Sequence, residues 1–550
     1  MSSLPTKFSS PPLLPGFVSA LEESLGRNVK PTPIQALSLK WLFENNLKEQ
    51  ADGQQKWKEF LLASETGSGK SIAYLLPLLQ GLKVSEKPIS TPNSESISTK
   101  PVSAPEHAPR ALILAPTHEL ARQLSGFAKS LLHDVKLRIM CASRANARNR
   151  DQPGFSSEVT AGVSISPSTA SPASFPVDVM VGTPVRLMEM IRGRGWDWER
   201  ASEKESRLQD EERKRERETD PWDTTEPKSV KSLFSNRKRV ASKELGLENI
   251  EWVIVDEADV LFDPDFQETT RQILADISAA RGVPMPEAAS TPTSYPFNLV
   301  LTSATIPTSL STYISTHHPD LIRLASPRLH RLPKTLKTEY VAWTHGTASN
   351  ARWRDVERQV REIWQDDVKE ASFQAQGSNK GQPKLSKVLI FVNKSVKVDE
   401  LGEYLDGKGI KTVALTGKSE DRKKGSNHHL DGFLRERGRR RSHLRDSDSN
   451  ATALNTSPTS LDPSQAPHVL ITTSLLSRGL DFSPEIKNVF IVDEPRNMID
   501  FIHRAGRTGR AGEKGRVVIF GKMKGRGSLR SEEVKKRVGV LSGGASGKRK

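Results

Sequence analysis

The sequence predicts an α/β protein built from two tandem domains, each a parallel β-sheet flanked by helices. Short apolar runs recur along the chain and alternate with helix-like segments, which is typical of parallel strands joined by crossover helices. The runs fall into two series of similar size, which indicates two domains. A glycine-rich loop follows the first run and precedes a helix-like segment, and this is a setting in which such folds bind phosphate.

Ten apolar runs are the expected strands. Those of the first domain are Phe60–Ala63, Ala111–Ala115, Val177–Val181, Trp252–Val255 and Leu299–Thr302. Those of the second are Val388–Val392, Lys411–Leu415, Val469–Thr472, Val489–Val492 and Val517–Phe520. The domains should join near Ser326–Lys337, where Pro327, Pro333 and several basic residues gather.

The chain is expected to have five parts. They are an N-terminal extension (1–30), a first domain (31–326), a linker (327–337), a second domain (338–522) and a basic tail (523–550). Polar insertions should loop out near 84–109, 145–176 and 194–242 in the first domain, and near 435–466 in the second. The mixed-charge insertion near 194–242 also fits a solvated helix, and the tail fits either RNA binding or plain solvation.

The charge balance favours a polyanionic partner. The 550 residues include 82 Lys and Arg against 66 Asp and Glu, which gives a net charge of +16. Nucleic acid is the expected partner, although a basic protein without one has the same composition. No apolar stretch reaches the ~18 residues of a membrane span. The single cysteine, Cys141, excludes an intrachain disulfide framework and a cysteine-based zinc site.

A phosphate loop is the first chemical motif. Its residues are Ser64, Glu65, Thr66, Gly67, Ser68, Gly69, Lys70 and Ser71, all candidates for nucleotide binding. Gly67 and Gly69 let backbone N–H groups close around phosphate oxygens, and the following helix adds its positive dipole. Lys70 reaches the β- and γ-phosphates, and the Ser71 hydroxyl suits Mg²⁺. Ser64 stands where this pattern usually has a glycine.

An acidic strand end supplies the second half of a hydrolytic site. The apolar run Val253–Val255 ends in Asp256 and Glu257, at the edge of the sheet where α/β proteins bind ligands. Asp256 is the candidate Mg²⁺ ligand, and Glu257 the candidate for orienting and deprotonating the attacking water. An acidic strand end alone is often only a helix cap. Together with the phosphate loop it predicts hydrolysis of a nucleoside triphosphate.

The run Asp256-Glu257-Ala258-Asp259 after such a loop resembles the signature of the DEAD-box RNA helicases. That resemblance implies two RecA-like domains and an ATP-dependent RNA helicase. Pro31-Thr32-Pro33-Ile34-Gln35 resembles the family's Q motif, in which the glutamine reads adenine, so Gln35 would select ATP. An upstream aromatic residue stacks on the base in the family, and Phe8 is the candidate here.

Further motifs resemble the RNA-binding parts of the family. Pro116–Ala121 is similar to motif Ia and Thr183–Arg186 to motif Ib, and both hold the RNA backbone in the family. The implied RNA-binding residues are Pro116, Thr117, Thr183 and Arg186, with Thr473 in the second domain. Such contacts reach phosphates and sugars and carry no base information, while recognition of the 2′-OH favours RNA over DNA.

The remaining motifs imply coupling between the domains. Ser303-Ala304-Thr305 resembles motif III, and Thr473-Ser474 with Arg478–Asp481 resembles motif V. Ile390–Asn393 resembles motif IV, and His503–Arg510 is similar to motif VI almost letter for letter. The family implies coupling roles for Asp259, Ser303, Thr305 and His503, a nucleotide contact for Asp481, and arginine fingers at Arg507 and Arg510. If these arginines lie on another domain from the phosphate loop, the site is complete only when the domains close.

Three positions depart from the family pattern: His118, Val185 and Ser474 stand where it usually has arginine, glycine and aspartate. They leave the ATP residues intact and weaken the expected RNA side. They motivate an alternative function, an ATP-gated RNA clamp or assembly scaffold with little unwinding. A DNA translocase is a third hypothesis, and tight ATP-dependent binding to DNA but not RNA would support it.

Gly182–Met190 followed by Arg192–Trp196 resembles a divergent fungal mitochondrial subgroup of the family, one implicated in assembly of the large mitochondrial ribosomal subunit. That resemblance implies a mitochondrial monomer that acts on ribosomal or other structured RNA with ribosome-assembly proteins, using ATP and Mg²⁺. A nuclear or cytoplasmic location is the alternative. Met1–Ala20 has no acidic residue, as in a transit peptide, but it is short and lacks arginine.

Overall fold

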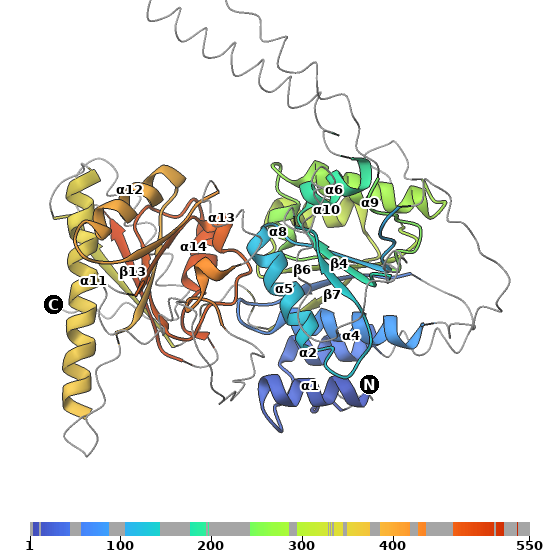
Figure 1. Cartoon of the computed structure of the whole chain (residues 1–550), viewed down its shortest axis with the longest axis horizontal. Helices are drawn as coiled ribbons and strands as arrows, with labels where there is room; N and C mark the ends of the chain where they lie inside the picture. Colours follow the sequence, from blue (N-terminus) through green and yellow to red (C-terminus); the bar gives the residue numbers. More distant parts are fainter. Residues whose placement is uncertain are drawn as a thin grey trace, which may run out of the picture.

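The computed structural model describes residues 4–9, 13–43, 57–86, 105–143, 176–193, 196, 243–284, 294–327, 329, 332, 335–344, 349–374, 385–417, 427–435, 466–510, 513–521 and 536. The four expected insertions and the basic tail lie almost entirely outside these residues. The described chain forms two lobes side by side, each an α/β unit (Figure 1). No helix of the described chain is both long and apolar enough to cross a bilayer.

The first lobe contains a seven-stranded sheet in the order β3-β4-β2-β5-β6-β1-β7, and every strand pair in it is parallel. The strands are β1 (Glu59–Ala63), β2 (Ala111–Leu114), β3 (Ile139–Cys141), β4 (Val179–Gly182), β5 (Trp252–Val255), β6 (Asn298–Ser303) and β7 (Ile322–Ala325). The helices are α1 (Pro15–Leu25), α2 (Pro33–Ser38), α4 (Lys70–Val84), α5 (His118–Ser130), α6 (Pro184–Arg192), α8 (Ala258–Leu261), α9 (Gln267–Ala280) and α10 (Thr308–His317), with a π-helical turn at Leu39–Phe43.

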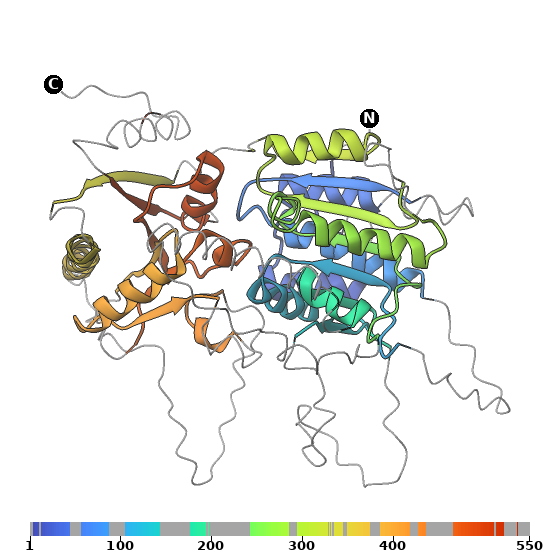
Figure 2. The same ribbon diagram turned by 90° about the horizontal axis from the view of Figure 1, so that it is seen from above.

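The second lobe contains a six-stranded parallel sheet in the order β10-β11-β9-β12-β13-β8. Its strands are β8 (Leu336–Ala342), β9 (Lys387–Phe391), β10 (Thr412–Leu415), β11 (Val469–Thr472), β12 (Ile486–Ile491) and β13 (Gly515–Gly521). The helices are α11 (Ser349–Gln374), α12 (Ser395–Asp406), α13 (Ser474–Ser477) and α14 (Met498–Ala505), with a 3₁₀ turn at His428–Leu430. Both views place α11 on the side of this lobe that faces away from the first lobe (Figures 1 and 2).

Helices cover both faces of the sheets, so the strands are buried on both sides (Figure 2). In β2 the side chains of Ala111 and Ile113 join one hydrophobic cluster, and those of Leu112 and Leu114 join another. This split follows from the two-residue period of a strand. The predicted α/β fold with two parallel sheets is confirmed.

All ten expected strands are present, and three further strands were missed. The missed strands β3, β7 and β8 lie at sheet edges. Edge strands are partly exposed, so their sequences lack a continuous apolar run: β3 has three residues, β7 reads Ile-Arg-Leu-Ala, and β8 reads Leu-Lys-Thr-Glu-Tyr-Val-Ala. Because β8 begins at Leu336, the last two residues of the expected 327–337 linker already belong to the second sheet.

Candidate active site

The phosphate loop connects β1 to α4 and is tightly curled. Gly67 and Gly69 adopt φ angles of 79° and 85°, in the left-handed region that favours glycine. The Lys70 ammonium donates to the carbonyl oxygens of Ser64 at 2.7 Å and Glu65 at 3.1 Å. Burial lowers the pKa of Lys70, while the nearby carboxylates of Glu257 and Asp256 oppose this shift. The Lys70 ammonium is therefore held inside the loop, where a bound phosphate would supply negative charge next to it.

The Q motif is tied directly to this loop. The buried Gln35 side chain accepts from the Thr32 N–H at 2.9 Å and donates to the Gly69 carbonyl at 3.2 Å. The Thr32 hydroxyl donates to the Ser68 carbonyl at 2.8 Å. A Cβ atom on Gly69 would lie only 2.3 Å from Gln35 Nε2, so the close packing here requires glycine. The structure thus gives Gln35 a contact with the phosphate loop, and its reading of adenine stays a prediction.

Phe8 borders a different hollow from the cavity at the phosphate loop. Its ring is buried in the hydrophobic cluster around α1, beside a hollow bordered by Val18 and Leu21. None of the residues around that hollow lines the cavity at the phosphate loop. The hollow also borders Lys30, which directly precedes the Q motif, and the expected stacking of Phe8 on a nucleotide base stays a prediction.

Two buried carboxylates face the loop from the end of β5. Asp256 accepts from the Tyr74 hydroxyl at 3.2 Å, from the Glu257 N–H at 3.1 Å and from the Thr302 hydroxyl. Burial, followed by the charge of Glu257, raises the pKa of Asp256 to about 6. Both effects would be relieved by a cation, so the oxygen donors of Asp256 and Ser71, which line the same cavity, fit Mg²⁺.

Glu257 has the features of a residue that acts on a bound molecule. It adopts a left-handed φ of 52° and is only 4% exposed. Its Oε2 atom is buried without a hydrogen-bond partner among the residues that the structure describes. An unpaired buried carboxylate oxygen is costly, so this atom requires a partner such as water. That requirement matches the predicted role in orienting an attacking water.

The two motif VI arginines reach the same cavity from the second lobe. Arg507 Nη1 and Arg510 Nη1 donate to the Leu480 carbonyl at 3.1 and 3.3 Å, and Arg510 also donates to Asp481 Oδ1 at 3.1 Å. Burial, and then the charge of Arg510, lowers the pKa of Arg507 to about 9. Arg507 Nη2 is buried without a partner in the described chain. An incoming anion would satisfy that donor and offset the burial.

These groups line one cavity of about 270 Å³. Figure 1 shows how the two lobes that supply them face one another. The walls of the cavity include Thr66, Gly67, Gly69, Lys70, Ser71, Asp256, Glu257, Asp481, Arg507 and Arg510. Ser64, Glu65 and Ser68 belong to the loop but do not form the wall. Arg435, which the sequence analysis missed, also lines the cavity and is exposed there.

A buried ion network joins the lobes beside the cavity. Asp259 accepts from the hydroxyls of Ser303 at 2.9 Å and Thr305 at 3.0 Å, both in the first lobe. From the second lobe, Arg478 donates to the same carboxylate and His503 Nε2 lies 3.1 Å from it. Burial opposes ionisation of Asp259, but Arg478 and then His503 hold its pKa well below the usual range. The structure therefore brings together all four residues expected to couple the lobes.

His503 is buried at this junction. Burial, and then the charge of Arg478, lowers its pKa. Thr305 Oγ1 lies 3.1 Å from His503 Nε2, so the ring contacts motif III as well as Asp259. Arg478 was not predicted to be the partner of Asp259. Its position in motif V was visible, but nothing local indicates a partner 219 residues away.

The expected RNA-binding residues divide into two groups. Thr117, Thr183 and Thr473 are the N-caps of α5, α6 and α13, and Pro116 precedes the first of them. Thr117, Thr183 and Arg186 are all buried, but Arg186 differs because its guanidinium pairs with Glu189 at 3.0 Å and Glu244 at 3.4 Å. Its guanidinium holds α6 to the neighbouring chain. Both ion-pair partners of Arg186 are glutamates, and its expected RNA contact stays a prediction.

The unusual serine of motif V has a defined place. Ser474 Oγ accepts from Arg504 Nε at 2.7 Å, and the same guanidinium pairs with Asp500 and donates to Asn393. Arg504 is fully buried, so each of these acceptors satisfies a donor that would otherwise be costly. A hydroxyl is enough here because Asp500 already supplies the negative charge.

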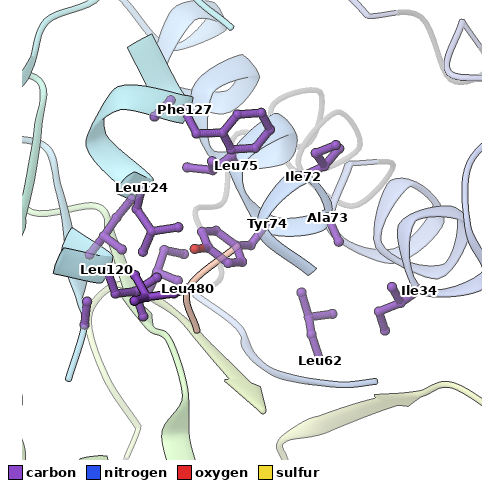
Figure 3. Close-up of a cluster of buried hydrophobic side chains, with 14 of the residues drawn as sticks. Ile34, Leu62, Ile72, Ala73, Tyr74, Leu75, Leu120, Leu124, Phe127 and Leu480 are labelled. Atoms are coloured by element: carbon purple, nitrogen blue, oxygen red, sulfur yellow. The ribbon is translucent and has the colours of Figure 1, made fainter. Parts of the chain in front are cut away.

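Further contacts show that the lobes are closed on one another. The Thr66 hydroxyl donates to the Gly506 carbonyl at 3.3 Å, and the Asn427 amide donates to the Glu119 carbonyl at 3.1 Å. Leu480 of the second lobe packs among Leu120 and Leu124 of α5 (Figure 3). Polar and apolar contacts therefore hold the same interface.

Known proteins with the same sequence features identify the family. The protein-family model described as DEAD/DEAH box helicase matches residues 32–210 and 202–312 of the sequence. The family model of the helicase conserved C-terminal domain matches residues 381–512. The chain therefore belongs to the DEAD/DEAH box helicase family, and it is an ATP-dependent RNA helicase of the DEAD-box type.

Its similar relatives include proteins named mitochondrial ATP-dependent RNA helicase MRH4. The relative from Cryptococcus neoformans (strain B-3501A) is 32% identical, over 94% of this chain and 83% of the relative. The relative from Aspergillus terreus is 26% identical, over 94% of this chain and 74% of the relative. Both matches span nearly the whole chain, including both lobes.

Two solved structures share the fold. Dbp5 of S. cerevisiae, bound to RNA and ADP BeF3, gives a TM-score of 0.56 at 17% identity, covering 98% of this chain and 95% of that one. Mss116p, bound to single-stranded RNA and AMP-PNP, gives a TM-score of 0.52 at 15% identity, covering 94% and 75%. These similarities confirm the two RecA-like lobes expected from the sequence.

Lobe closure can be tested at Gly506. A Cβ atom there would lie 2.1 Å from Thr66 Oγ1 in the other lobe and 3.0 Å from the Ile502 carbonyl in its own lobe, and alanine readily adopts the φ of −70°. Gly506→Ala should therefore oppose closure and weaken RNA binding in the presence of AMP-PNP about tenfold, a loss of about 1.4 kcal/mol. Gly402→Ala on α12, which does not line the cavity and where the nearest contact of a Cβ is an ordinary 3.4 Å, is the control. Unchanged binding by Gly506→Ala, measured by fluorescence anisotropy, would contradict the closed geometry.

The Asp259 network can be tested by removing its charge. Asp259→Asn leaves Arg478 without its counter-ion, and breaking such a buried pair costs about 3 kcal/mol. If that loss of free energy destabilises the closed form, the stimulation of ATP turnover by RNA should fall about 100-fold. Asp276→Asn, which breaks the more exposed pair with Arg192, is the control and should stay near wild type. Equal steady-state rates for the two variants would rule out the network as the coupling element.

Proposed function

We propose that ATP is hydrolysed in the cavity between the lobes, with Lys70, Glu257, Arg507 and Arg510 as the catalytic residues. The observation that carries this proposal is the single cavity that joins the phosphate loop and Glu257 of one lobe to both arginines of the other. Phosphoryl transfer depends on positioning and on neutralising charge, and neither lobe has both sets of groups.

Each residue has a distinct task in this proposal. Lys70 and the loop N–H groups hold the β- and γ-phosphates, and Gln35 makes adenine the preferred base. Glu257 Oε2 orients the attacking water and takes its proton, which suits a buried oxygen with no described partner. The free Nη2 of Arg507 and the guanidinium of Arg510 stabilise charge on the transferred phosphoryl group. Asp481 sits beside Arg510 and contacts the nucleotide.

Mg²⁺ is the proposed metal cofactor, held by Ser71 and Asp256. Both residues line the cavity, and the carboxylate of Asp256 is buried close to that of Glu257. The ion supplies charge neutralisation for the phosphates when it is bound. The hydroxyls of Thr302 and Tyr74 fix the orientation of Asp256.

RNA is proposed to cross both lobes at Pro116, Thr117, Thr183 and Thr473. Three of these residues cap helices, where backbone N–H groups and small side chains suit phosphate oxygens. Two solved structures of similar fold are described by their names as bound to RNA, which supports RNA as the class of ligand. Arg186 is left out of the set because glutamates occupy its guanidinium.

The cellular role proposed is mitochondrial RNA remodelling, by a protein acting as a monomer with ribosomal or other structured RNA. The names of the MRH4 relatives support the mitochondrial location. A part in assembly of the large mitochondrial ribosomal subunit follows from the subgroup resemblance, with ribosome-assembly proteins as partners. Crosslinking in cells followed by RNA sequencing tests the target, since enrichment of other RNA classes would refute the ribosomal role.

A second candidate function is an ATP-gated RNA clamp with little unwinding. The exposed Val185, 46% accessible at the start of α6, favours it, because a branched side chain there holds phosphate away from the backbone. A clamp needs closure and RNA binding but no strain on a duplex. Both functions share the same ATP cavity.

The catalytic assignment predicts the effect of two substitutions. Lys70→Ala removes the phosphate-binding ammonium and Glu257→Gln the proton acceptor, so each should lower ATP turnover at least about 10³-fold. Glu257→Gln should also retain RNA in its ATP-bound form, because binding and closure remain. Lys83→Ala, on the same helix as Lys70 but paired at the surface with Glu86, is the control. Ordinary turnover by either catalytic variant in a phosphate-release assay would refute the assignment.

Strand separation distinguishes the helicase from the clamp. Single-turnover unwinding of a short RNA duplex, with excess protein and saturating ATP, should release the strand at a rate that Glu257→Gln abolishes. ATP turnover that RNA stimulates without strand release would establish the clamp instead. Replacing Val185 by glycine should increase RNA affinity several-fold if that side chain blocks the backbone.

A further inference from the structure

Gln123 makes an unusual contact between the lobes. It lies on α5 of the first lobe, and its side-chain amide meets the backbone of Asp481 in the second. Gln123 Oε1 accepts from the Asp481 N–H at 2.8 Å, and Nε2 donates to the Asp481 carbonyl at 3.1 Å. One side chain thus satisfies both backbone groups of a single residue 358 positions away.

The anchored backbone lies beside the catalytic arginines. Asp481 Oδ1 accepts from Arg510 Nη1 at 3.1 Å, and the preceding carbonyl of Leu480 accepts from Arg507 and Arg510. The Asp481 carbonyl also accepts from the Arg435 N–H at 3.0 Å. Displacing the Leu480–Asp481 backbone would therefore move the acceptors that aim both arginines.

The same helix begins at the proposed RNA contact. Thr117 caps α5, and Gln123 follows six residues later, under two turns along a rigid helix. Leu120 and Leu124 of that segment pack against Leu480, and Figure 3 shows the three side chains together. A Cβ atom on Gly479 would lie 2.3 Å from Leu120, so only glycine permits this approach. The amide of Gln123 therefore reaches Asp481 beside an apolar contact.

We propose that Gln123 is a positioning residue that couples RNA binding to the arginine fingers. It forms its two hydrogen bonds only when the lobes close, and it then fixes the α5 helix to the backbone that aims Arg507 and Arg510. RNA held at Thr117 favours this arrangement, and the arrangement completes the ATP cavity. This proposal rests on the proposed function of that cavity.

The test compares Gln123→Met and Gln123→Glu with Lys129→Ala, an exposed change on the same helix. Methionine has similar length and no amide. Glutamate keeps an acceptor for the Asp481 N–H, but its second oxygen faces the carbonyl and repels it. RNA affinity is measured by anisotropy with and without AMP-PNP, and ATP turnover is measured against RNA concentration.

Both Gln123 variants should bind RNA normally without nucleotide and about tenfold more weakly with AMP-PNP, a coupling loss of about 1.4 kcal/mol. The RNA concentration for half-maximal ATP turnover should rise by a similar factor, and kcat at saturating RNA should fall. Lys129→Ala should match wild type in every assay.

Two results would overturn the proposal: full coupling in Gln123→Met, or an equal loss of RNA affinity with and without AMP-PNP, which is the mark of a damaged lobe. Thermal unfolding of each variant identifies a folding defect. If Gln123→Met has such a defect, Gln123→Glu is the second test of the proposal. Wild-type protein without RNA-stimulated turnover would instead refute the proposed function itself.

Discussion

The pairing of Asp259 with Arg478 and His503 is the interaction on which the closed molecule depends. A carboxylate buried in one lobe has its charge balanced from the other, so its burial is tolerable only when the lobes meet. The hydroxyls of Ser303 and Thr305 orient that carboxylate from within its own lobe. Closure then places Arg507 and Arg510 on the cavity that already holds Lys70. In the proposed mechanism, the site can therefore hydrolyse ATP only when the lobes are in contact.

The parallel sheets explain why the functional groups gather where they do. The carboxyl ends of β1 and β5 lie at the same edge of one parallel sheet. This arrangement brings the phosphate loop close to Asp256. The second sheet presents the motif V and motif VI segments in the same way. The interface adds apolar contacts, such as Leu480 with Leu120, to the polar network. Each lobe supplies half of a site, and in the closed molecule Glu257 Oε2 and Arg507 Nη2 are buried without a hydrogen-bond partner among the described residues.

Much of the fold was predictable because buried strands appear in the sequence as continuous apolar runs. The phosphate loop was predictable because its glycine-rich motif is local in the sequence. Edge strands such as β8 were missed because solvent on one side interrupts the apolar run. Arg186 was assigned to RNA from its motif position, and nothing in the sequence indicated that two glutamates would pair with its guanidinium. Gln123 and Arg478 were missed as bridging residues for a different reason. Their partners lie hundreds of residues away, and only the tertiary fold brings them together.

The central claim is that the lobes close together on ATP and RNA and so complete one site. The most direct measurement is energy transfer between dyes on the two lobes, attached through Asp320→Cys and Glu370→Cys in a Cys141→Ala background; both label positions are exposed. We predict a high-transfer state that is strongly populated only with AMP-PNP and RNA together, and that is lost in Asp259→Asn. A transfer efficiency that ignores both ligands, or that survives loss of Asp259, would contradict the account.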